Sequence, residues 1–290
     1  MSVDARLALA DRLVRAAGDI ARRVLDAPRM SISAKGAGDV VSEADLAIEG
    51  MVRREVAQHF PEDALLGEEG GGSGARNGFT WLVDPIDGTV NYTRRLGYFC
   101  VSLCLLEDGR PIAAWILDPV QAELFHAGPD RAMQVNGNPV GCSEQSDIRE
   151  AVFGLGFSPR HAPERVEQIV AAVRRSGAEH RRLGAGALCL AHVAAGRLEG
   201  YLEPHMNPWD AVGGLYLAAC AGALVGPYLE RGGLSDGAPV IALAPAVANT
   251  LLAQLPAPFS GTPLSSGNEP RSAGELRRGR KPSPNAETKP

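Results

Sequence analysis

The 290-residue chain contains no run of about 18 apolar residues, so we expect no transmembrane helix. Its formal net charge is −5, so the sequence does not predict the basic surface that a nucleic acid or an anionic membrane would bind. Residues 1–23 are charged and amphipathic, and they lack the apolar core of a signal peptide. We therefore expect neither a membrane nor a nucleic acid as a partner.

Cysteine is scarce and odd in number, which argues against a disulfide framework. The five cysteines are scattered and lie mostly among apolar neighbours, which predicts reduced, buried thiols and a cytoplasmic location. Cys100 and Cys104 share one face of a strand-like segment, but no further cysteine or histidine spacing typical of a zinc site accompanies them.

The composition is that of an ordinary globular protein, with 45% apolar and 22% charged residues, and the length allows one or two domains. Apolar periodicity predicts helices at 4–27, 43–59, 163–175, 186–195, 210–221 and 246–255. Strands are predicted at 64–66, 80–84, 101–106, 112–117, 123–126, 132–135, 151–154, 180–183 and 198–202. This order predicts an α/β (or α+β) fold in which sheets and helices form layers.

The C-terminal segment differs from the rest in composition. From about residue 257 the chain is rich in Pro, Gly, Ser, Glu and Arg and has almost no large apolar side chain. Such a segment cannot bury enough surface to order itself, so we predict a folded domain at 1–256 and a disordered tail at 257–290. The basic cluster at 277–281 could contact an anionic partner, although a solvated tail is the simpler interpretation.

The most informative segment is Trp81–Tyr92, in which an apolar run ends in two carboxylates, Asp84 and Asp87. Mg²⁺ prefers oxygen ligands and usually lies between carboxylates and substrate phosphates. Pro85 stiffens the turn that holds the two acids, and Gly88 lets an anion approach the backbone. The segment therefore predicts a metal and phosphate site, although an Asp-Pro pair after a strand is also a common turn.

Two further segments carry acids at similar places. Gly67–Gly70 (Gly-Glu-Glu-Gly) follows a short apolar strand, and Asn207–Asp210 begins an apolar helix. Each has a simpler explanation, because turn acids are often only solvated and an acid at a helix start is stabilised by the helix dipole. Ends of strands and starts of helices are also the places where side chains from distant segments converge.

These three segments, in this order, resemble the inositol monophosphatase family from about residue 5 to residue 255. The resemblance implies the layered αβαβα sandwich of that family, Mg²⁺ as cofactor and a homodimer. It also implies that the metal ligands are four carboxylates and one backbone carbonyl, from Glu68, Asp84, Asp87, Asp210 and Ile86.

The resemblance further implies that Glu68 and Thr89 orient and deprotonate the attacking water, with Asp45 and Lys35 close to Thr89. The backbone N–H groups of Gly88 and Thr89 would hold the phosphate. For Asp45 a structural role stands beside the catalytic one. Ser42 and Asp45 have the spacing of a capping box at the start of the helix 43–59.

The alcohol end of the substrate is less well specified. By resemblance, Glu203 binds a sugar hydroxyl, but its position alone also fits a surface acid at the end of a strand. The small residues Gly184 and Ala185 would let a polyol approach the backbone. His205 lies nearby in the sequence and is given no role.

The expected function is Mg²⁺-dependent hydrolysis of a small phosphate monoester by an activated water, with inositol monophosphate as substrate. Because the same motifs occur in related enzymes, histidinol phosphate, fructose 1,6-bisphosphate and 3′-phosphoadenosine nucleotides remain alternative substrates. A different class of protein is also possible, namely a non-catalytic binding protein that keeps the fold. The presence of all four metal carboxylates favours the enzyme.

Overall fold

The computed structural model describes residues 2–36, 39–72, 76–129, 131–158 and 160–266. In the first half, an eight-stranded sheet has the order β10-β9-β8-β7-β6-β5-β3-β4. Its strands are β3 (Ala64–Gly67), β4 (Gly71–Gly72), β5 (Phe79–Asp87), β6 (Cys100–Glu107), β7 (Arg110–Asp118), β8 (Glu123–Gly128), β9 (Arg131–Val135) and β10 (Asn138–Pro139). Strands β3 and β5 run parallel, and the other neighbouring pairs are antiparallel.

Helices cover both faces of this sheet because its central strands are apolar on both sides. Trp81 packs in the same buried cluster as α1 (Val3–Asp26) and α2 (Glu43–His59). The next residue, Leu82, points to the opposite face and joins the cluster of α5 (Gly186–Ala194) and α6 (Pro208–Cys220). The alternation follows from the two-residue period of a strand.

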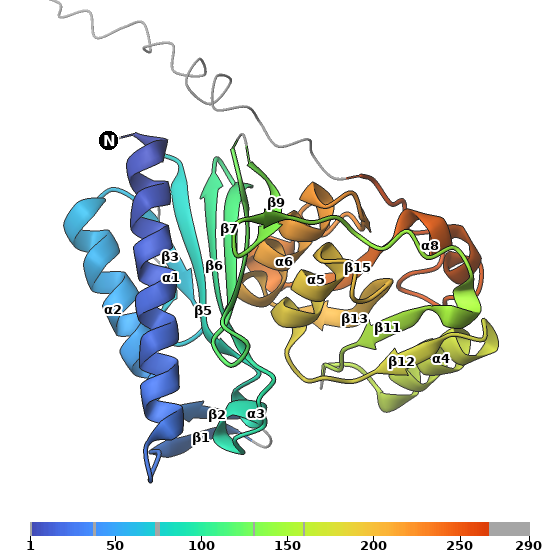
Figure 1. The fold of residues 1–290 in the computed structure, drawn as a ribbon, viewed down its shortest axis with the longest axis horizontal. Coiled ribbons are helices and arrows are strands. Elements are labelled where there is room, and N and C mark those ends of the chain that lie inside the picture. The colour runs from blue at the N-terminus through green and yellow to red at the C-terminus, as the bar shows by residue number, and fades with distance from the viewer. Residues whose placement is uncertain (1, 37–38, 73–75, 130, 159, 267–290) are drawn as a thin grey trace, which may run out of the picture.

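A second sheet, of five strands, lies on the other side of α5 and α6 (Figure 1). Its order is β12-β11-β13-β15-β14, with β11 (Val152–Leu155), β12 (Glu179–Arg181), β13 (Gly200–Met206), β14 (Leu224–Val225) and β15 (Ala238–Leu243). Helices α4 (Pro163–Arg175) and α8 (Pro245–Leu252) share a buried cluster with its outer face. The layers therefore run α, β, α, β, α, and the predicted layered sandwich is confirmed.

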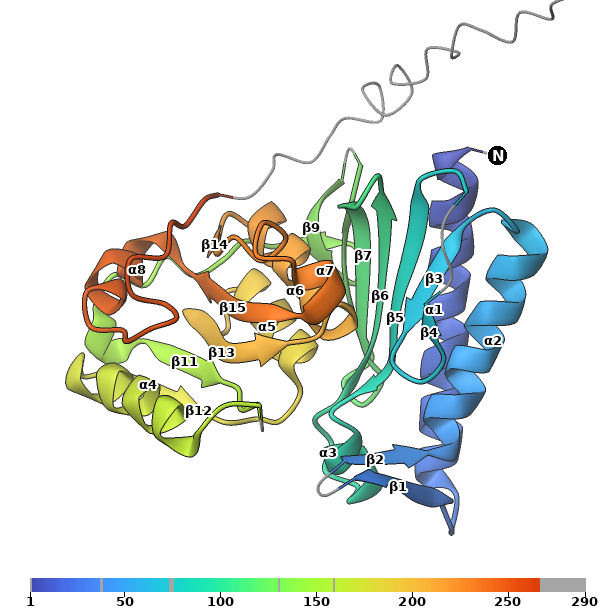
Figure 2. The same ribbon diagram turned by 180° about the vertical axis from the view of Figure 1, so that it is seen from behind.

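Short elements connect these layers. The hairpin of β1 (Ile32–Gly36) and β2 (Asp39–Ser42) lies beside α3 (Thr89–Thr93), at the lower end of the first sheet (Figures 1 and 2). The remaining short elements are η1 (Ile148–Glu150) and α7 (Gly233–Asp236). Within the described ranges, no helix is long and apolar enough to cross a membrane.

The predicted helices are confirmed, with ends that differ by at most a few residues, and the predicted capping box of Ser42 and Asp45 is present. Strand β15 has no counterpart among the predicted strands. The prediction of a strand at 198–202 ends too early, because β13 extends to Met206. Glu203 therefore lies inside a strand and not at its end.

The predicted boundary at residue 256 is too early. Phe259 has no exposed surface and belongs to the same buried cluster as α4 and α8. Val225 forms a β-bridge with Ser265. The packed domain thus extends at least to Ser265, and the part of the predicted tail at 267–290 lies outside the described residues.

Candidate active site

Strand β5 brings Asp84 and Asp87 to the same side of the first sheet. Residues three positions apart in a regular strand would face opposite sides. Here Asp84 pairs with Ser102 and Asp87 pairs with Cys100, so β5 contains one extra residue between the two pairs. This bulge turns both carboxylates toward the layer of α5 and α6. The amide of Ile86 also donates to Oδ1 of Asp84, at 3.0 Å, which stiffens the turn.

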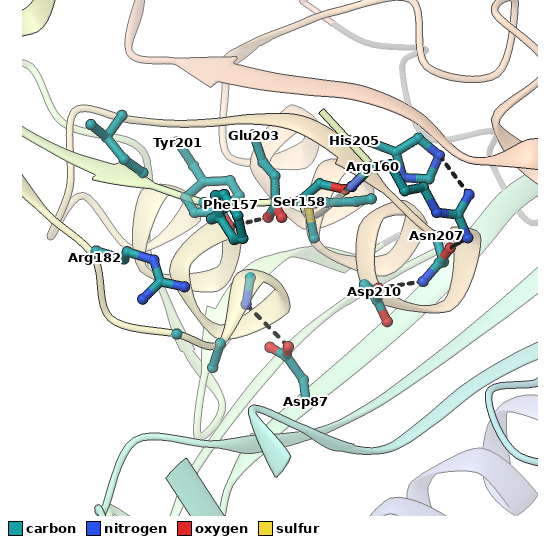
Figure 3. A pocket seen from close by; sticks show the side chains of 16 residues that line it. Asp87, Phe157, Ser158, Arg160, Arg182, Tyr201, Glu203, His205, Asn207 and Asp210 are labelled. Carbon is teal, nitrogen blue, oxygen red and sulfur yellow. Dashed lines mark hydrogen bonds between the residues drawn. The ribbon is translucent and has the colours of Figure 1, made fainter. Parts of the chain in front are cut away.

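Asp87 joins the two halves of the chain. Its carboxylate accepts hydrogen bonds from the backbone amides of Gly186 and Leu188, at 3.1 and 3.2 Å, in the first turn of α5 (Figure 3 shows the bond to Gly186). The residue is 8% exposed, and burial raises the pKa of its carboxyl. The carboxylate thus lies where the first sheet meets α5.

Glu68 lies beside Asp84 because of the parallel pairing of β3 and β5. Gly67 pairs with Val83, so the residues that follow them leave neighbouring strands at the same edge of the sheet. The charge of Glu68 is, after burial itself, the largest cause of the strong rise in the pKa of Asp84. Two carboxylates at this edge therefore repel each other unless a proton or a cation separates them.

Asp210 completes this group from the second half of the chain. It lies in the first turn of α6, after Asn207, whose side-chain amide donates to it at 3.3 Å. Burial and the charges of Asp87 and Glu68 raise the pKa of Asp210 to about 8. The four carboxylates predicted as metal ligands thus lie together in one region of the molecule.

Asp45 takes part in two arrangements. Its Oδ2 atom accepts hydrogen bonds from the amide and the hydroxyl of Ser42, at 2.9 and 2.5 Å, which is the capping box. Its Oδ1 atom is buried and has no hydrogen-bond partner among the described residues. Asp45 also forms a cluster with Glu68 and Glu69, in which one oxygen of each lies within 4.8 Å of the others. Burial raises the pKa of Asp45 to about 6. The capping and site interpretations are therefore compatible.

The predicted phosphate and alcohol segments meet at Gly88, which has a φ of 92°. A Cβ atom at this position would lie 3.0 Å from Cβ of Ala185 and 3.1 Å from the carbonyl oxygen of Gly184. The side-chain amide of Asn91 donates to the carbonyl of Leu183 at 2.8 Å and so holds the alcohol segment, Gly184 and Ala185, in place. The hydroxyl of Thr89 donates to the carbonyl of Ile86 at 3.0 Å.

A pocket of about 380 Å³ opens beside these carboxylates (Figure 3). Glu203 lines it, and burial raises the pKa of this carboxyl to about 8. The hydroxyl of Tyr201, buried in the same strand, donates to Glu203 at 2.5 Å. The alternative interpretation of Glu203 as a surface acid at a strand end is therefore wrong. Other polar side chains of the pocket come from Asp87, Ser158, Arg160, Arg182, His205, Asn207 and Asp210.

Sequence reasoning missed several of these residues. Tyr201 stands two positions before Glu203, so the strand period would have placed it on the same face. Arg160 and Arg182 come from connecting segments, and no pattern in the sequence marks them. The side chain of Lys35, expected near Thr89, lies outside the described residues.

The donor set of this region suits a hard divalent cation, because every candidate ligand is an oxygen atom. Several carboxylates buried together are unfavourable unless a positive charge compensates them. The orphaned Oδ1 atom of Asp45 also points to a missing polar neighbour. The residues present thus fit Mg²⁺.

The sequence is similar to proteins of known family. The sequence model of the inositol monophosphatase family matches residues 3–255. Nus factor SuhB of Xylella fastidiosa is 33% identical over 217 residues, which make up 74% of this chain and 78% of that protein. Nus factor SuhB of Pseudomonas aeruginosa is 34% identical over 245 residues, with 80% of this chain and 90% of that protein covered.

Solved structures share the fold. The extragenic suppressor protein suhB of Bartonella henselae matches with a TM-score of 0.78 and 26% identity, over 85% of this chain and 96% of that one. An inositol monophosphatase from Anabaena matches with a TM-score of 0.72 and 30% identity, over 88% of this chain and 97% of that one.

Proposed function

The chain belongs to the inositol monophosphatase family, and on that premise we propose that it is a Mg²⁺-dependent phosphatase whose substrate is inositol monophosphate. Family membership supports phosphatase activity in general, and the substrate is part of the proposal. The observation that carries the proposal is the convergence of four carboxylates from both halves of the chain, beside a pocket large enough for a polyol phosphate.

In the proposal, Mg²⁺ is held by the carboxylates of Glu68, Asp84, Asp87 and Asp210 and by the carbonyl of Ile86. That carbonyl accepts one hydrogen bond, from Thr89, and so keeps a lone pair for a cation. When bound, Mg²⁺ supplies the positive charge that neutralises a phosphate monoester and acidifies a water molecule.

The residues around Thr89 would prepare the attack on phosphorus. The hydroxyl of Thr89 donates a hydrogen bond to the carbonyl of Ile86, so its oxygen can accept a hydrogen bond from the attacking water. Glu68 would accept the proton of that water, and Asp45 faces the same carboxylate from α2. The amides of Gly88 and Thr89 would donate to the phosphate oxygens.

The alcohol part of the substrate would occupy the pocket between Gly184, Ala185 and Glu203. Tyr201 fixes the orientation of the Glu203 carboxyl, which can then accept a hydrogen bond from a substrate hydroxyl. A carboxylate would also accept an ammonium group, so histidinol phosphate remains the main alternative within the family.

The test is Mg²⁺-dependent release of phosphate from inositol 1-phosphate, histidinol phosphate, fructose 1,6-bisphosphate and 3′-phosphoadenosine 5′-phosphate. We expect fastest release from inositol 1-phosphate, with loss of that activity in Asp87→Asn. Faster phosphate release from another of these compounds would make that compound the substrate in place of inositol monophosphate. No release from any of them by the folded, Mg²⁺-loaded protein would contradict the enzyme function.

A second candidate function comes from relatives that carry the name Nus factor SuhB. It would be a role in transcription that needs the fold but not catalysis. Binding of the wild-type chain and of Asp87→Asn to transcription complexes of the same organism would test it. Equal binding of both would support the role, and absence of binding by the wild type would exclude it.

The proposal includes a cytoplasmic location, which the five unpaired cysteines support. It also includes a homodimer, which rests on the family resemblance. The mass of the protein by light scattering and its fractionation in cells test these two points.

A further inference from the structure

Three polar side chains of α2 lie on one face of that helix, toward the turn that carries Glu68. They are Asp45, Glu49 and Arg53, spaced four residues apart, so they follow one another along the helix. Asp45 has been described above. Glu49 is only 3% exposed and takes no part in the proposed catalysis, so its burial needs another reason.

The Glu49 carboxylate binds the backbone of the turn directly. Its two oxygens accept hydrogen bonds from the amides of Glu69 and Gly70, at 2.8 and 2.7 Å. These are the two amides that follow Glu68. A carboxylate that accepts backbone N–H groups forms charge-assisted bonds, which are stronger than neutral ones.

Arg53, one turn further along α2, contacts both Glu49 and the Glu68 turn. Its guanidinium donates to Glu49 and also to the carbonyl of Gly71, with distances of 2.8 and 2.6 Å. The charge of Glu49 is thus compensated, and the backbone from Glu69 to Gly71 is tied to the helix at three consecutive residues.

The contacts of Glu49 and Arg53 explain why positions 67 and 70 are glycines. A Cβ atom on Gly67 would lie 2.6 Å from the carboxyl carbon of Glu49. A Cβ atom on Gly70 would lie 2.7 Å from two guanidinium nitrogens of Arg53. Only glycine lets the helix side chains approach this closely, so the glycines are required by the same contacts that hold the turn.

We propose that Glu49 and Arg53 are positioning residues that fix the backbone of this turn and thereby direct the Glu68 carboxylate toward Asp84. The inference rests on the proposed function, because it takes Glu68 as a metal ligand. Neither residue touches the substrate. Groups that orient metal ligands typically change metal affinity or activity about 10- to 100-fold when they are removed.

The first variant is Glu49→Gln, which keeps the size of the side chain but offers only one acceptor oxygen to the two amides. Mn²⁺ alone is titrated into the full-length variant and followed by electron paramagnetic resonance. We expect a dissociation constant for Mn²⁺ about tenfold higher than that of the wild type. We also expect a higher Mg²⁺ requirement for phosphate release, with the KM for substrate at saturating Mg²⁺ unchanged.

The second variant is Arg53→Ala, for the case that Glu49→Gln does not fold. The Arg53 side chain is 30% exposed, so its removal disturbs the core less than a change at Glu49. We expect its dissociation constant for Mn²⁺ to rise as well. Arg54→Ala, the next residue on the same helix and exposed, is the matched control and should bind Mn²⁺ normally.

Asp63→Asn controls for general loss of stability. Asp63 is another buried carboxylate paired with an arginine, Arg6, but it lies outside the proposed site. The inference is overturned if Asp63→Asn weakens Mn²⁺ binding as much as Glu49→Gln at an equal loss of melting temperature. It is also overturned if folded Glu49→Gln and Arg53→Ala bind Mn²⁺ normally while Glu68→Gln binds it weakly. Normal Mn²⁺ binding by Glu68→Gln would instead contradict the metal site of the proposed function, and this inference with it.

Discussion

The hydroxyl of Tyr201 donates a hydrogen bond of 2.5 Å to Oε2 of Glu203, two residues further along β13. Both side chains line the pocket, and Glu203 is the carboxyl whose pKa burial raises to about 8. The bond leaves the other carboxyl oxygen of Glu203 available to a ligand. The pair therefore forms one polar part of the proposed alcohol site.

Replacing Glu203 should affect substrate binding more than the chemical step. For Glu203→Gln we expect the KM for inositol 1-phosphate to rise about tenfold, with a smaller change in kcat, because a hydroxyl contact is weakened. Tyr201→Phe should also raise the KM for inositol 1-phosphate. Tyr216→Phe, which removes a buried hydroxyl bonded to Ile112, is the control. A fall in kcat at constant KM would contradict this role.

Asp87→Asn should abolish most of the Mg²⁺-dependent activity, with a fall of at least about 100-fold in kcat, because a charged ligand is lost. The amide oxygen of the substituted side chain can still accept one of the bonds from Gly186 and Leu188. Repulsion from Asp84 and Asp210 also falls. We therefore expect little change in the melting temperature measured by differential scanning fluorimetry. Near-normal turnover by the folded variant would contradict the assignment.

Thr89→Ala should lower kcat about 100-fold and change the affinity for Mn²⁺ much less, because its hydroxyl orients the water and is not a ligand. Thr89→Ser, which keeps the hydroxyl, should retain most of the activity. Thr93→Ala is the matched control, since the hydroxyl of Thr93 donates to the carbonyls of Thr89 and Val90 within α3. Weaker Mn²⁺ binding with kcat retained would show that the water-orienting role is wrong.

The stability of the chelator-treated protein should decrease as the pH rises from about 5 to about 8. The pKa of Asp210 is 3.8 in the unfolded reference and about 8 in the fold, and that of Asp84 is also raised. A carboxyl with a raised folded pKa stabilises the fold below its unfolded pKa, and this contribution is lost as the pH rises through the folded value. The expected fall in melting temperature is roughly 5 °C or more.

Mg²⁺ should reverse this trend, because it binds the deprotonated carboxylates that repel one another. The rise in melting temperature on adding Mg²⁺ should therefore be larger at pH 8 than at pH 5. The same series with Asp210→Asn is the control and should show a weaker pH dependence. A melting temperature that rises with pH in chelator would contradict the prediction.

Truncation should show that residues 257–266 contribute to stability and that residues 267–290 do not. A chain ending at residue 266 should melt like the full chain, whereas a chain ending at residue 256 loses Phe259 and Thr262, both buried. Phe259→Ala alone should lower the free energy of unfolding by about 3–5 kcal/mol, the usual effect of removing a buried aromatic side chain. Equal melting of the two truncated chains would contradict this.

The layers of the fold could be predicted because long helices and apolar strands have strong periodicity. Strand β15 was missed because its segment, Ala238–Leu243, is short and apolar throughout, without alternation. Packing of residues 257–266 was missed because it depends on a few apolar side chains, Phe259 and Leu264, within a mostly polar segment. Composition averaged over the whole tail hides them.

Within the candidate site, the places of the three acidic segments at strand ends and a helix start indicated that they converge, and the family resemblance selected the four acids among them. It did not indicate how Asp84 and Asp87 face the same side, since the bulge in β5 depends on pairing with β6. It also did not reveal the contacts of Glu49, because an acid within a helix usually faces solvent.

The two sheets contribute different side chains to the proposed site. Glu68, Asp84 and Asp87 belong to the first sheet and its turns, whereas Tyr201 and Glu203 belong to the second. Substitutions at Tyr201 and Glu203 would change the lining of the pocket, whereas Glu68, Asp84 and Asp87 are carried by β5 and the turn after β3. Under the proposed function, such substitutions would change which phosphorylated alcohol the pocket accepts more than they change the proposed metal site.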